Sequence, residues 1–351
     1  MAKVRGPEYA TLVERFMGLL HLPYLVGCVF VILLFSLVGI GGAQTIYLRT
    51  FDFAKFVAEW LPQTPAAAAG FTAFYLLFFW LLYSPHYMRK KLLRAEAPIS
   101  ALLSNGEEDF HKLFGRLSAL KPQLIVWISL WISIFAVIAI VAGGFPLPQS
   151  IELVLFLTFA NIIILGFTSL VWSYFISLWG IYKMGGASLK LRSYYKDRLL
   201  GLKPVGSLAL SLVAAYFAFV GIYISTAIGS PTPLPPVANA IFSGLIIPGL
   251  LMFILPLRRF HQRMLQQKKL ERDRLEERLD QIYQNPSGTN SPSDLSQLFF
   301  SLSISDTMKK EISSIASWPY DIQIIGRVIG IALSVLGIIV AQLVLRYLLR
   351  P

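Results

Sequence analysis

The sequence predicts an all-α, polytopic integral membrane protein with seven transmembrane helices, its N-terminus inside, and extended cytoplasmic helices between the sixth and seventh spans. Seven apolar stretches of about 20 residues divide the chain, and such stretches must be helical in lipid, where no water satisfies the backbone. Only 14% of the 351 residues are charged, against roughly 25% in soluble domains. The positive charges gather in alternate connections between the apolar stretches.

The apolar stretches predict spans at approximately 18–40, 71–88, 123–143, 151–181, 205–228, 240–257 and 323–349. The first has too long an apolar core for a signal peptide, and Glu8 and Glu14 precede it, so we interpret it as an uncleaved signal-anchor. The last has an uncharged core of 18 residues, Val328 to Leu345, which leaves a re-entrant or surface helix as its alternative. The single cysteine, Cys28, allows no intrachain disulfide.

Orientation follows from the Lys and Arg residues in the connections. With the N-terminus inside, 27 of the 31 lie on the inner side, and the outer loops 144–150 and 229–239 carry none. The net charge of +12 is then the ordinary topology signal, so we expect the lipid bilayer as a partner and no nucleic acid. We expect the plasma membrane as the location, with the N-terminus cytoplasmic.

We divide the chain into a six-span membrane bundle (1–257) with cytoplasmic loops 89–122 and 182–204, a cytoplasmic helical hairpin (258–321) and a final transmembrane helix (322–351). Residues 258–284 contain no Gly or Pro and continue the sixth span as a rod. Their apolar pattern is short, which favours a helix packed on its neighbours over an independent coiled coil.

The second half of the hairpin is predicted from its start and stop signals. The turn-forming residues 285–290 end the rod, and Pro292 suits the first position of the returning helix. This helix should end at Ser317–Asp321, because the residue before Pro319 is pushed out of the α region. Its apolar stripe is expected to pack on the rod: Phe300, Ile304, Met308, Ile312 and Ile315.

Two spans carry small residues along one face. The candidate pore or packing face of the last span consists of Gly326, Gly330, Ser334, Gly337, Ala341 and Gln342. The fifth span has a similar line, formed by Ser207, Ser211, Ala214, Ala218, Gly221 and Ser225. In lipid such faces let helix backbones approach closely. We expect tight packing between these helices, with a small-residue lining of a path or pocket as the functional alternative.

Polar groups at membrane depth point to function because each must be paired or hydrated. The candidate intramembrane polar site is in the fourth span: Asn161, Thr168, Ser169 and Ser173. No span carries a charge near its centre, which disfavours proton- or sodium-coupled transport. In the sixth span, Pro248 and Gly249 predict a kink, which is either a hinge or a packing adjustment.

No catalytic or metal-binding arrangement stands out, so we expect neither an enzyme nor a cofactor. Glu107–His111 combines carboxylates with a histidine but lacks a second histidine at helical spacing, and we interpret it as a solvated loop. The connection Leu191–Pro204 places aromatic rings beside cations. It suits an amphipathic segment that contacts lipid headgroups or the inner helices.

Several of these features are similar to the insect gustatory and odorant receptor architecture. They are seven spans, an inner N-terminus, long inner extensions of the fourth and sixth spans, and a seventh segment split at Trp318-Pro319. That family ends its last span with Thr-Tyr, five apolar residues and Gln-Phe; here Val335–Leu343 keeps the apolar spacing and Gln342. The resemblance implies a ligand-gated cation channel, typically a tetramer, whose final membrane helix lines the pore.

The leading functional hypothesis is therefore a sensor or channel-like homo-oligomer, a tetramer by the resemblance. Residues 258–316 would form its assembly platform, and the last span would face a central axis. The alternative is a membrane scaffold or accessory subunit that recruits a cytoplasmic protein through the hairpin. A second alternative is a transporter for a small apolar solute, using the kink at Pro248 and the polar face of the fourth span.

Overall fold

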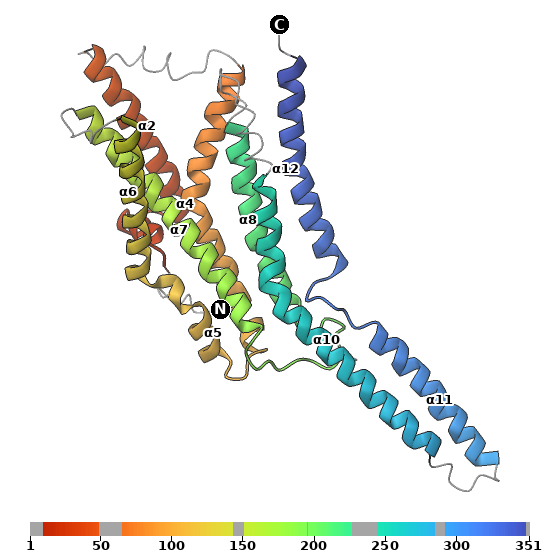
Figure 1. Cartoon of the computed structure of the whole chain (residues 1–351). Helices are drawn as coiled ribbons and strands as arrows, with labels where there is room; N and C mark the ends of the chain where they lie inside the picture. The colour runs from red at the N-terminus through yellow and green to blue at the C-terminus, as the bar shows by residue number, and fades with distance from the viewer. Residues whose placement is uncertain are drawn as a thin grey trace.

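The computed structural model describes residues 10–48, 65–142, 151–194, 196–226, 244–284 and 292–348, and these residues contain helices and no β-strand. The helices are Leu12–Leu19 (α1), Tyr24–Leu48 (α2), Pro65–Ser100 (α4), Glu107–Phe114 (α5), the 3-10 turn Gly115–Ser118 (η2), Leu120–Ala142 (α6), Ile151–Met184 (α7), Lys203–Thr226 (α8), Ile246–Gln284 (α10), Pro292–Ser313 (α11) and Ile322–Leu348 (α12). Figure 1 shows a bundle from which α10 and α11 extend at one end; we call this end the hairpin side.

The predicted all-α membrane class is confirmed. By length and composition, the described residues contain four helical segments able to cross a bilayer, Ala68–Ser100, Glu107–Ala136, Ala160–Met184 and Lys203–Thr226. The bent pair α1–α2 is a fifth if it forms one span. The first predicted span overlaps both α1 and α2, and each of the other six overlaps one helix, but the described apolar part of α12, Gln323–Gly337, is shorter than a full crossing.

The first predicted span begins later than expected. The prediction of a helix from residue 18 is wrong, because the chain turns by 82° between α1 and α2. His21 adopts a positive φ of 53° in the turn, and Pro23 precedes the first residue of α2. Proline restricts the residue before it, so the continuous apolar pattern hides a backbone break. The short α1 is therefore free to pack across the bundle.

The predicted loop 89–122 is largely helical. Helix α4 continues to Ser100, and residues 107–114 form α5 rather than the expected solvated loop. The solvated-loop interpretation is wrong because Phe110 and Phe114 are fully buried. Phe114 occupies the space that a Cβ at Gly180 of α7 would need. An apolar pair at i,i+4 thus anchors the helix while its carboxylates stay exposed.

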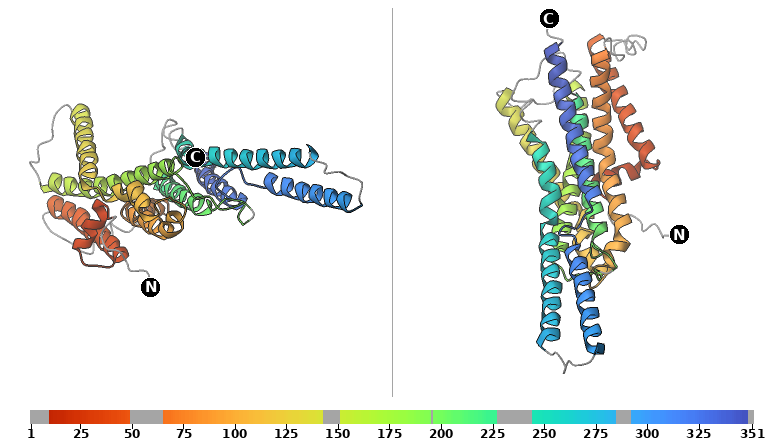
Figure 2. Two further views of the ribbon diagram at one scale, coloured as in Figure 1. Left: turned by 90° about the horizontal axis from the view of Figure 1, so that it is seen from below. Right: turned by 90° about the vertical axis from the view of Figure 1, so that its right-hand side faces the viewer.

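Helix α8 is the centre of the bundle. It packs against α4, α12, α10 and α7, and its buried side chains include Leu208, Leu212 and Phe217. Side chains of its neighbours donate hydrogen bonds to its backbone, from Trp80 Nε1 to the Ala215 carbonyl (3.1 Å) and from Tyr174 Oη to the Leu212 carbonyl (2.9 Å). In contrast, α6 packs mainly on α7 and stands apart in the view from below (Figure 2).

Helices α10 and α11 form a hairpin that runs away from the bundle, and the last turn of α12 lies at the opposite end (Figures 1 and 2). Helix α10 continues without a break through Pro256 to Gln284, as the rod predicted. Helix α11 begins at Pro292, the predicted first position, and ends at Ser313, a few residues before the predicted stop. The turn predicted at 285–290 lies outside the described residues.

The predicted stripe of α11 is only partly buried. Ile312 and Ile315 are buried, whereas Phe300 is 70% exposed. The reason is geometric: a step of four residues advances roughly 40° beyond a full turn, so positions spaced four apart drift around a straight helix. Phe300 is about 120° away from Ile312 by this count. The prediction that the whole stripe packs on the rod is therefore wrong at its distal end.

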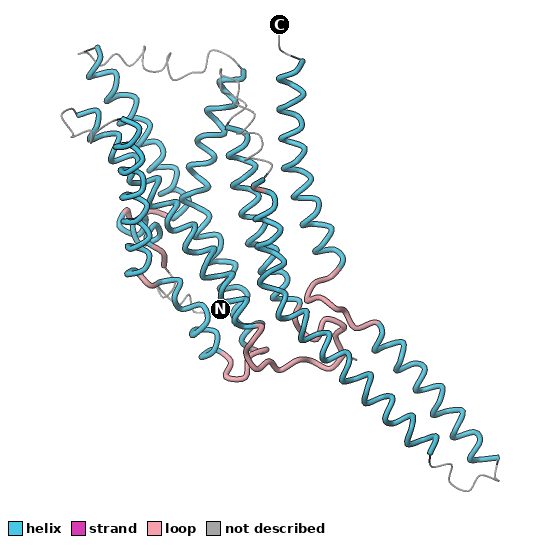
Figure 3. Tube along the Cα trace, in the orientation of Figure 1, coloured by secondary structure: helices cyan, strands magenta, loops and turns pink. Residues whose placement is uncertain are grey.

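Loops and turns gather where the hairpin meets the bundle (Figure 3). An antiparallel bridge joins Leu103 to Leu189 across two of these connections. The described residues of the connection 185–202 are rich in turns, and the Arg198 carbonyl accepts a hydrogen bond from the Ala316 N–H (3.2 Å). The segment therefore contacts the connection between α11 and α12, while its predicted contact with lipid headgroups or the inner helices stays a prediction.

Candidate functional site

The four predicted polar residues of α7 do not form one site. Thr168, Ser169 and Ser173 are buried inside the bundle, whereas Asn161 is exposed. Asn161 lies in a cavity of about 480 Å³ between α6 and α7, where its Oδ1 accepts a hydrogen bond from Trp131 Nε1 (3.4 Å). Ser173 Oγ donates to the Ser169 carbonyl (2.7 Å). Helix α7 thus presents polar groups to two different surroundings.

The buried serines of α7 belong to an anchor for α1. Ser169 Oγ accepts a hydrogen bond from the Val13 N–H (3.2 Å), and Gln123 Oε1 of α6 accepts one from the Leu12 N–H (2.9 Å). These are backbone donors in the first turn of α1, which have no partners within the helix. Polar side chains of α6 and α7 therefore complete the N-terminus of α1.

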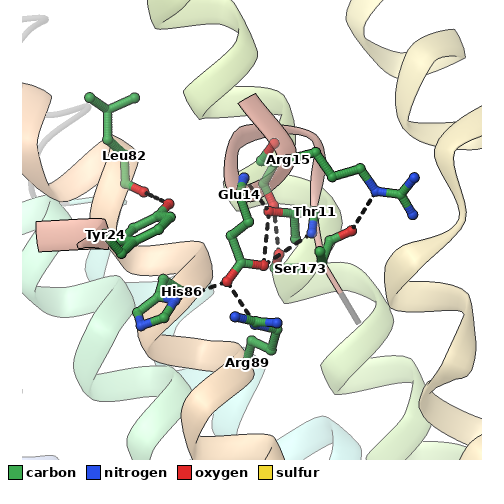
Figure 4. A network of polar contacts seen from close by, with 10 residues as sticks. Thr11, Glu14, Arg15, Tyr24, Leu82, His86, Arg89 and Ser173 are labelled. Carbon is green, nitrogen blue, oxygen red and sulfur yellow. Dashed lines mark hydrogen bonds and ion pairs between the residues drawn. The ribbon is translucent and has the colours of Figure 1, made fainter. Parts of the chain in front are cut away.

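An ion cluster completes this anchor on the α4 side (Figure 4). The Glu14 carboxylate, whose side chain is only 3% exposed, lies 2.7 Å from Arg89 Nε and 3.0 Å from His86 Nδ1. Its other oxygen accepts from the Thr11 N–H (3.0 Å), and Thr11 Oγ1 accepts in turn from the Glu14 N–H (3.4 Å). This reciprocal pair is a capping box. A buried carboxylate needs such partners because burial alone is costly.

An aromatic ring supports the ion cluster from α2. The Tyr24 ring stacks on the His86 imidazole with centroids 4.3 Å apart, and Tyr24 Oη donates to the Leu82 carbonyl (2.6 Å). Helices α1, α2 and α4 thus meet at the ion cluster around Glu14, a residue that the sequence analysis used only as evidence against a signal peptide. The Thr11-x-x-Glu14 spacing was the available signal, since it matches a capping box.

A cavity of about 510 Å³ lies between α4, α8 and α12, in the half of the bundle away from the hairpin. Much of its wall is the small-residue line of α8, through Ala214, Ala218, Gly221 and Ser225. Helix α12 contributes Ser334, whose Oγ donates to the Gly330 carbonyl (2.8 Å). An apolar cavity of this size suits a small apolar molecule. The line on α8 thus borders a pocket as well as a helix contact.

The glycines of α12 point away from the bundle, whereas Ser334 borders the cavity between α4, α8 and α12. An added Cβ at Gly326, Gly330 or Gly337 would meet no atom within 4 Å. Helix α12 instead packs on α8, and its buried side chains are Ile324, Val328 and Val335. Ser334 and Ala341 are exposed, and the side chain of Gln342 lies outside the described residues. The face that was predicted to pack is open within one chain.

The predicted hinge in the sixth span is at the beginning of a helix. Helix α10 starts at Ile246, so Pro248 lies in its first turn, where a missing N–H breaks no helical hydrogen bond. A Cβ at Gly249 would lie 2.7 Å from Phe217 Cζ of α8. This placement favours the packing alternative, because glycine lets α10 approach α8 closely.

Several contacts hold residues 314–321, the connection between α11 and α12 that we call the elbow. The Trp318 ring stacks on His261 of α10 with centroids 4.1 Å apart, and the His261 Nδ1 lies 2.6 Å from the Ser317 carbonyl oxygen. Lys268 Nζ donates to the carbonyls of Ser313 (2.7 Å) and Ile315 (3.2 Å), which completes the C-terminus of α11. The elbow therefore connects α11 and α12 through α10.

Close packing at the elbow is possible because of Gly206 in α8. A Cβ there would overlap the Pro319 carbonyl oxygen. The neighbouring Tyr320 ring contacts Phe253 with centroids 5.3 Å apart, and its burial raises the pKa of the Tyr320 hydroxyl, so the side chain stays neutral. Movement of the hairpin relative to α8 would have to break these contacts.

No group of three or more His, Cys, Asp or Glu side chains within the described residues is arranged to hold a metal ion. His111 lies 3.8 Å from Glu96, and Glu108 pairs with Lys112 on the surface of α5. Comparison of the chain with protein-family models, curated proteins and solved structures gives no match. The functional assignment therefore depends on the physical features described above.

Proposed function

We propose that this chain is the subunit of a channel-like, homo-oligomeric membrane protein that crosses the plasma membrane seven times. Its N-terminus and hairpin lie in the cytoplasm, and α12 faces the central axis. The observation that carries the proposal is the open face of α12. Its other face packs on α8, so the line of Gly326, Gly330 and Gly337 is available to a second copy.

The hairpin side supports the same assembly. Phe299 and Phe300 are each 70% exposed on a helix that extends beyond the bundle. Large apolar side chains in water are typical of protein interfaces when they occur together. Contacts between hairpins of neighbouring subunits would bury this pair and hold the α12 helices around one axis. This arrangement is the one that the resemblance to the insect receptors implies.

Gating in this proposal uses the cavity and the elbow. A small apolar ligand in the cavity between α4, α8 and α12 would contact Ser334 and Val335, and so bias the position of α12. The elbow at 314–321 would pass the change to the hairpin through His261 and Lys268. Ligand binding and opening are then coupled through α12 itself.

The test is the oligomeric state in nanodiscs, measured by mass photometry on the wild type and on the double variant Gly330→Leu with Gly337→Leu. We expect a defined oligomer, four copies by the resemblance, that the double variant converts to a monomer. Val328→Ala is the matched control, because Val328 is buried on the α8 side. A wild-type monomer, or an oligomer unaffected by the double variant, would contradict the central role of α12. Electrical recording from the purified oligomer then tests conduction.

The same exposed pair, Phe299 and Phe300, favours a second candidate function. A scaffold that recruits a cytoplasmic protein through the hairpin would use these side chains for a different chain. A monomeric membrane part that retains a partner through Phe299 and Phe300, and shows no current, would favour the scaffold over the channel.

A further inference from the structure

Helices α7 and α10 meet at a corner that contains three cations, Lys183, Arg259 and Arg263. Gly185 and Gly186 end α7 and allow the approach. A Cβ at Gly185 would lie 2.7 Å from Arg259 Cβ, and one at Gly186 would lie 2.8 Å from Arg259 Nη1. Arg263 Nη2 donates to the Gly186 carbonyl (3.1 Å). The backbone therefore brings the guanidinium groups of α10 to the last turn of α7.

Aromatic rings orient two of these cations without neutralising them. The Arg259 guanidinium lies 3.9 Å from the Tyr182 ring centroid, and Lys183 Nζ lies 5.3 Å from that of Trp179. Among the described residues, none of the three corner cations forms an ion pair. Further along the same helix, Arg272 and Arg274 pair with Glu276 and Glu271. The corner therefore keeps positive charge available for an external anion.

Exposed apolar side chains extend from this corner along both helices. On α7 they are Val171, Phe175 and Trp179, spaced four residues apart and followed by Lys183. On α10 they are Ile247, Leu251 and Leu255, with the same spacing and followed by Arg259. Twelve residues of helix cover about 18 Å, close to the length of a lipid acyl chain. On each helix the exposed apolar side chains, which we call the apolar stripe, are therefore followed, at the next position of the same spacing, by a cation of the corner.

We propose that the α7–α10 corner binds an anionic phospholipid, with its phosphate-bearing headgroup on Arg259 and Arg263 and its acyl chains along the two apolar stripes. Guanidinium groups match phosphate oxygens in a bidentate geometry. The corner also lies on the hairpin side, where most cations gather and where anionic lipids are expected. The proposal requires membrane insertion and this orientation, and it does not depend on the oligomeric state.

The full-length protein in nanodiscs provides the test. The probe is a photo-crosslinkable phosphatidylserine in a phosphatidylcholine background, and crosslinked peptides are located by mass spectrometry. We expect crosslinks on α7 and α10 near the corner. The double variant Arg259→Gln with Arg263→Gln should lower phosphatidylserine capture by about 30-fold, from about fivefold per lost cation. Capture of photo-crosslinkable phosphatidylcholine should change little.

The matched control removes the same charge elsewhere on α10, by Arg272→Gln with Arg274→Gln, and should leave capture unchanged. An equal loss in both double variants would overturn the site in favour of general surface charge. Wild-type protein that shows no preference for phosphatidylserine would also overturn it.

Two further measurements separate the remaining explanations. Glycerophosphoserine, which has the headgroup without acyl chains, should compete only at far higher concentration; competition equal to that of the lipid would overturn the role of the apolar stripes. Arg259→Lys keeps the charge but not the guanidinium fork, and should lower capture by several-fold with an unchanged circular dichroism spectrum. Full capture by this variant would overturn the bidentate contact.

Discussion

Helices α8 and α12 carry the same sequence pattern, a line of small residues at helical spacing, but the structure surrounds the two lines differently. On α8 the line borders the cavity beside α4 and α12, and its Gly221 is buried; next to the line, Gly206 lies against the Pro319 carbonyl. On α12, Gly330 and Gly337 meet nothing within 4 Å of an added Cβ. A small-residue pattern thus permits close approach, while the neighbouring helices decide whether the approach takes place within one chain.

The largest difference between the two helices is expected when leucine replaces one glycine of each, Gly206 of α8 and Gly330 of α12. Gly206→Leu should destabilise the protein by about 3 kcal/mol or more, since backbone atoms at Pro319 must move to admit the side chain. Gly330→Leu should leave the stability of the monomer unchanged or slightly raised, because leucine is the better helix former. Thermal unfolding in detergent micelles measures both. Equal losses at the two positions would remove the distinction between the helices.

A second test compares a buried ion pair, that of Glu14 in the anchor of α1, with an exposed one, that of Glu276 on α10. Glu14→Gln should cost about 2 kcal/mol, because Arg89 and His86 lose their buried carboxylate partner. The measurement is the free energy of unfolding in micelles, with protease accessibility of α1 as a local report. Glu276→Gln is the control, since its pair with Arg272 is exposed and should contribute well under 1 kcal/mol. A neutral Glu14→Gln variant would mean that α1 is held by other contacts.

The elbow tests whether the contacts around α10 set the position of the hairpin. Lys268→Met keeps most of the side-chain volume but removes two charge-assisted hydrogen bonds to the end of α11. We expect a loss of about 1 kcal/mol and faster hydrogen exchange in residues 308–316. Lys269→Met, at an exposed neighbour, should leave exchange there unchanged. Unchanged exchange in the Lys268 variant would show that the aromatic stack alone holds the elbow.

The smallest effect on the monomer is expected at the exposed end of α11. Phe299→Ser with Phe300→Ser should change monomer stability by no more than about 0.5 kcal/mol, because neither ring is buried within the chain. The same variant should weaken assembly, which size-exclusion chromatography with light scattering reports. A large loss of monomer stability would place these rings inside the subunit and remove them from the interface.

The sequence was most informative where composition and solvent dominate. The apolar stretches predicted the helices that the structure describes, and the uninterrupted 258–284 segment predicted the long part of α10. The sequence was least informative where a backbone turn or the contact with a neighbouring helix sets the local structure. The break at His21–Pro23 lies inside an apolar pattern, and Phe300 follows the correct spacing but faces away from α10. Mean hydropathy is an average over many residues. It therefore detects neither a backbone turn nor the gradual drift of positions spaced four apart around a helix.

The candidate sites also separate into features that the sequence predicts and features that depend on neighbouring helices. The small-residue lines were visible in the sequence, but only the arrangement of α4, α8 and α12 separates a pocket lining from an open face. The Glu14 cluster was not predicted, because residues 72 positions apart come together at the separation of a hydrogen bond. The α7–α10 corner likewise needs the end of α7 in contact with the interior of a distant helix, α10.

The sequence by itself determined that this protein is helical and membrane-embedded, because lipid leaves an apolar chain no other way to satisfy its backbone. Tertiary structure alone decided which charges are paired, which glycines are covered and where cavities remain. These outcomes depend on distances of a few ångströms between segments far apart in the chain. Local periodicity contains no information about such distances.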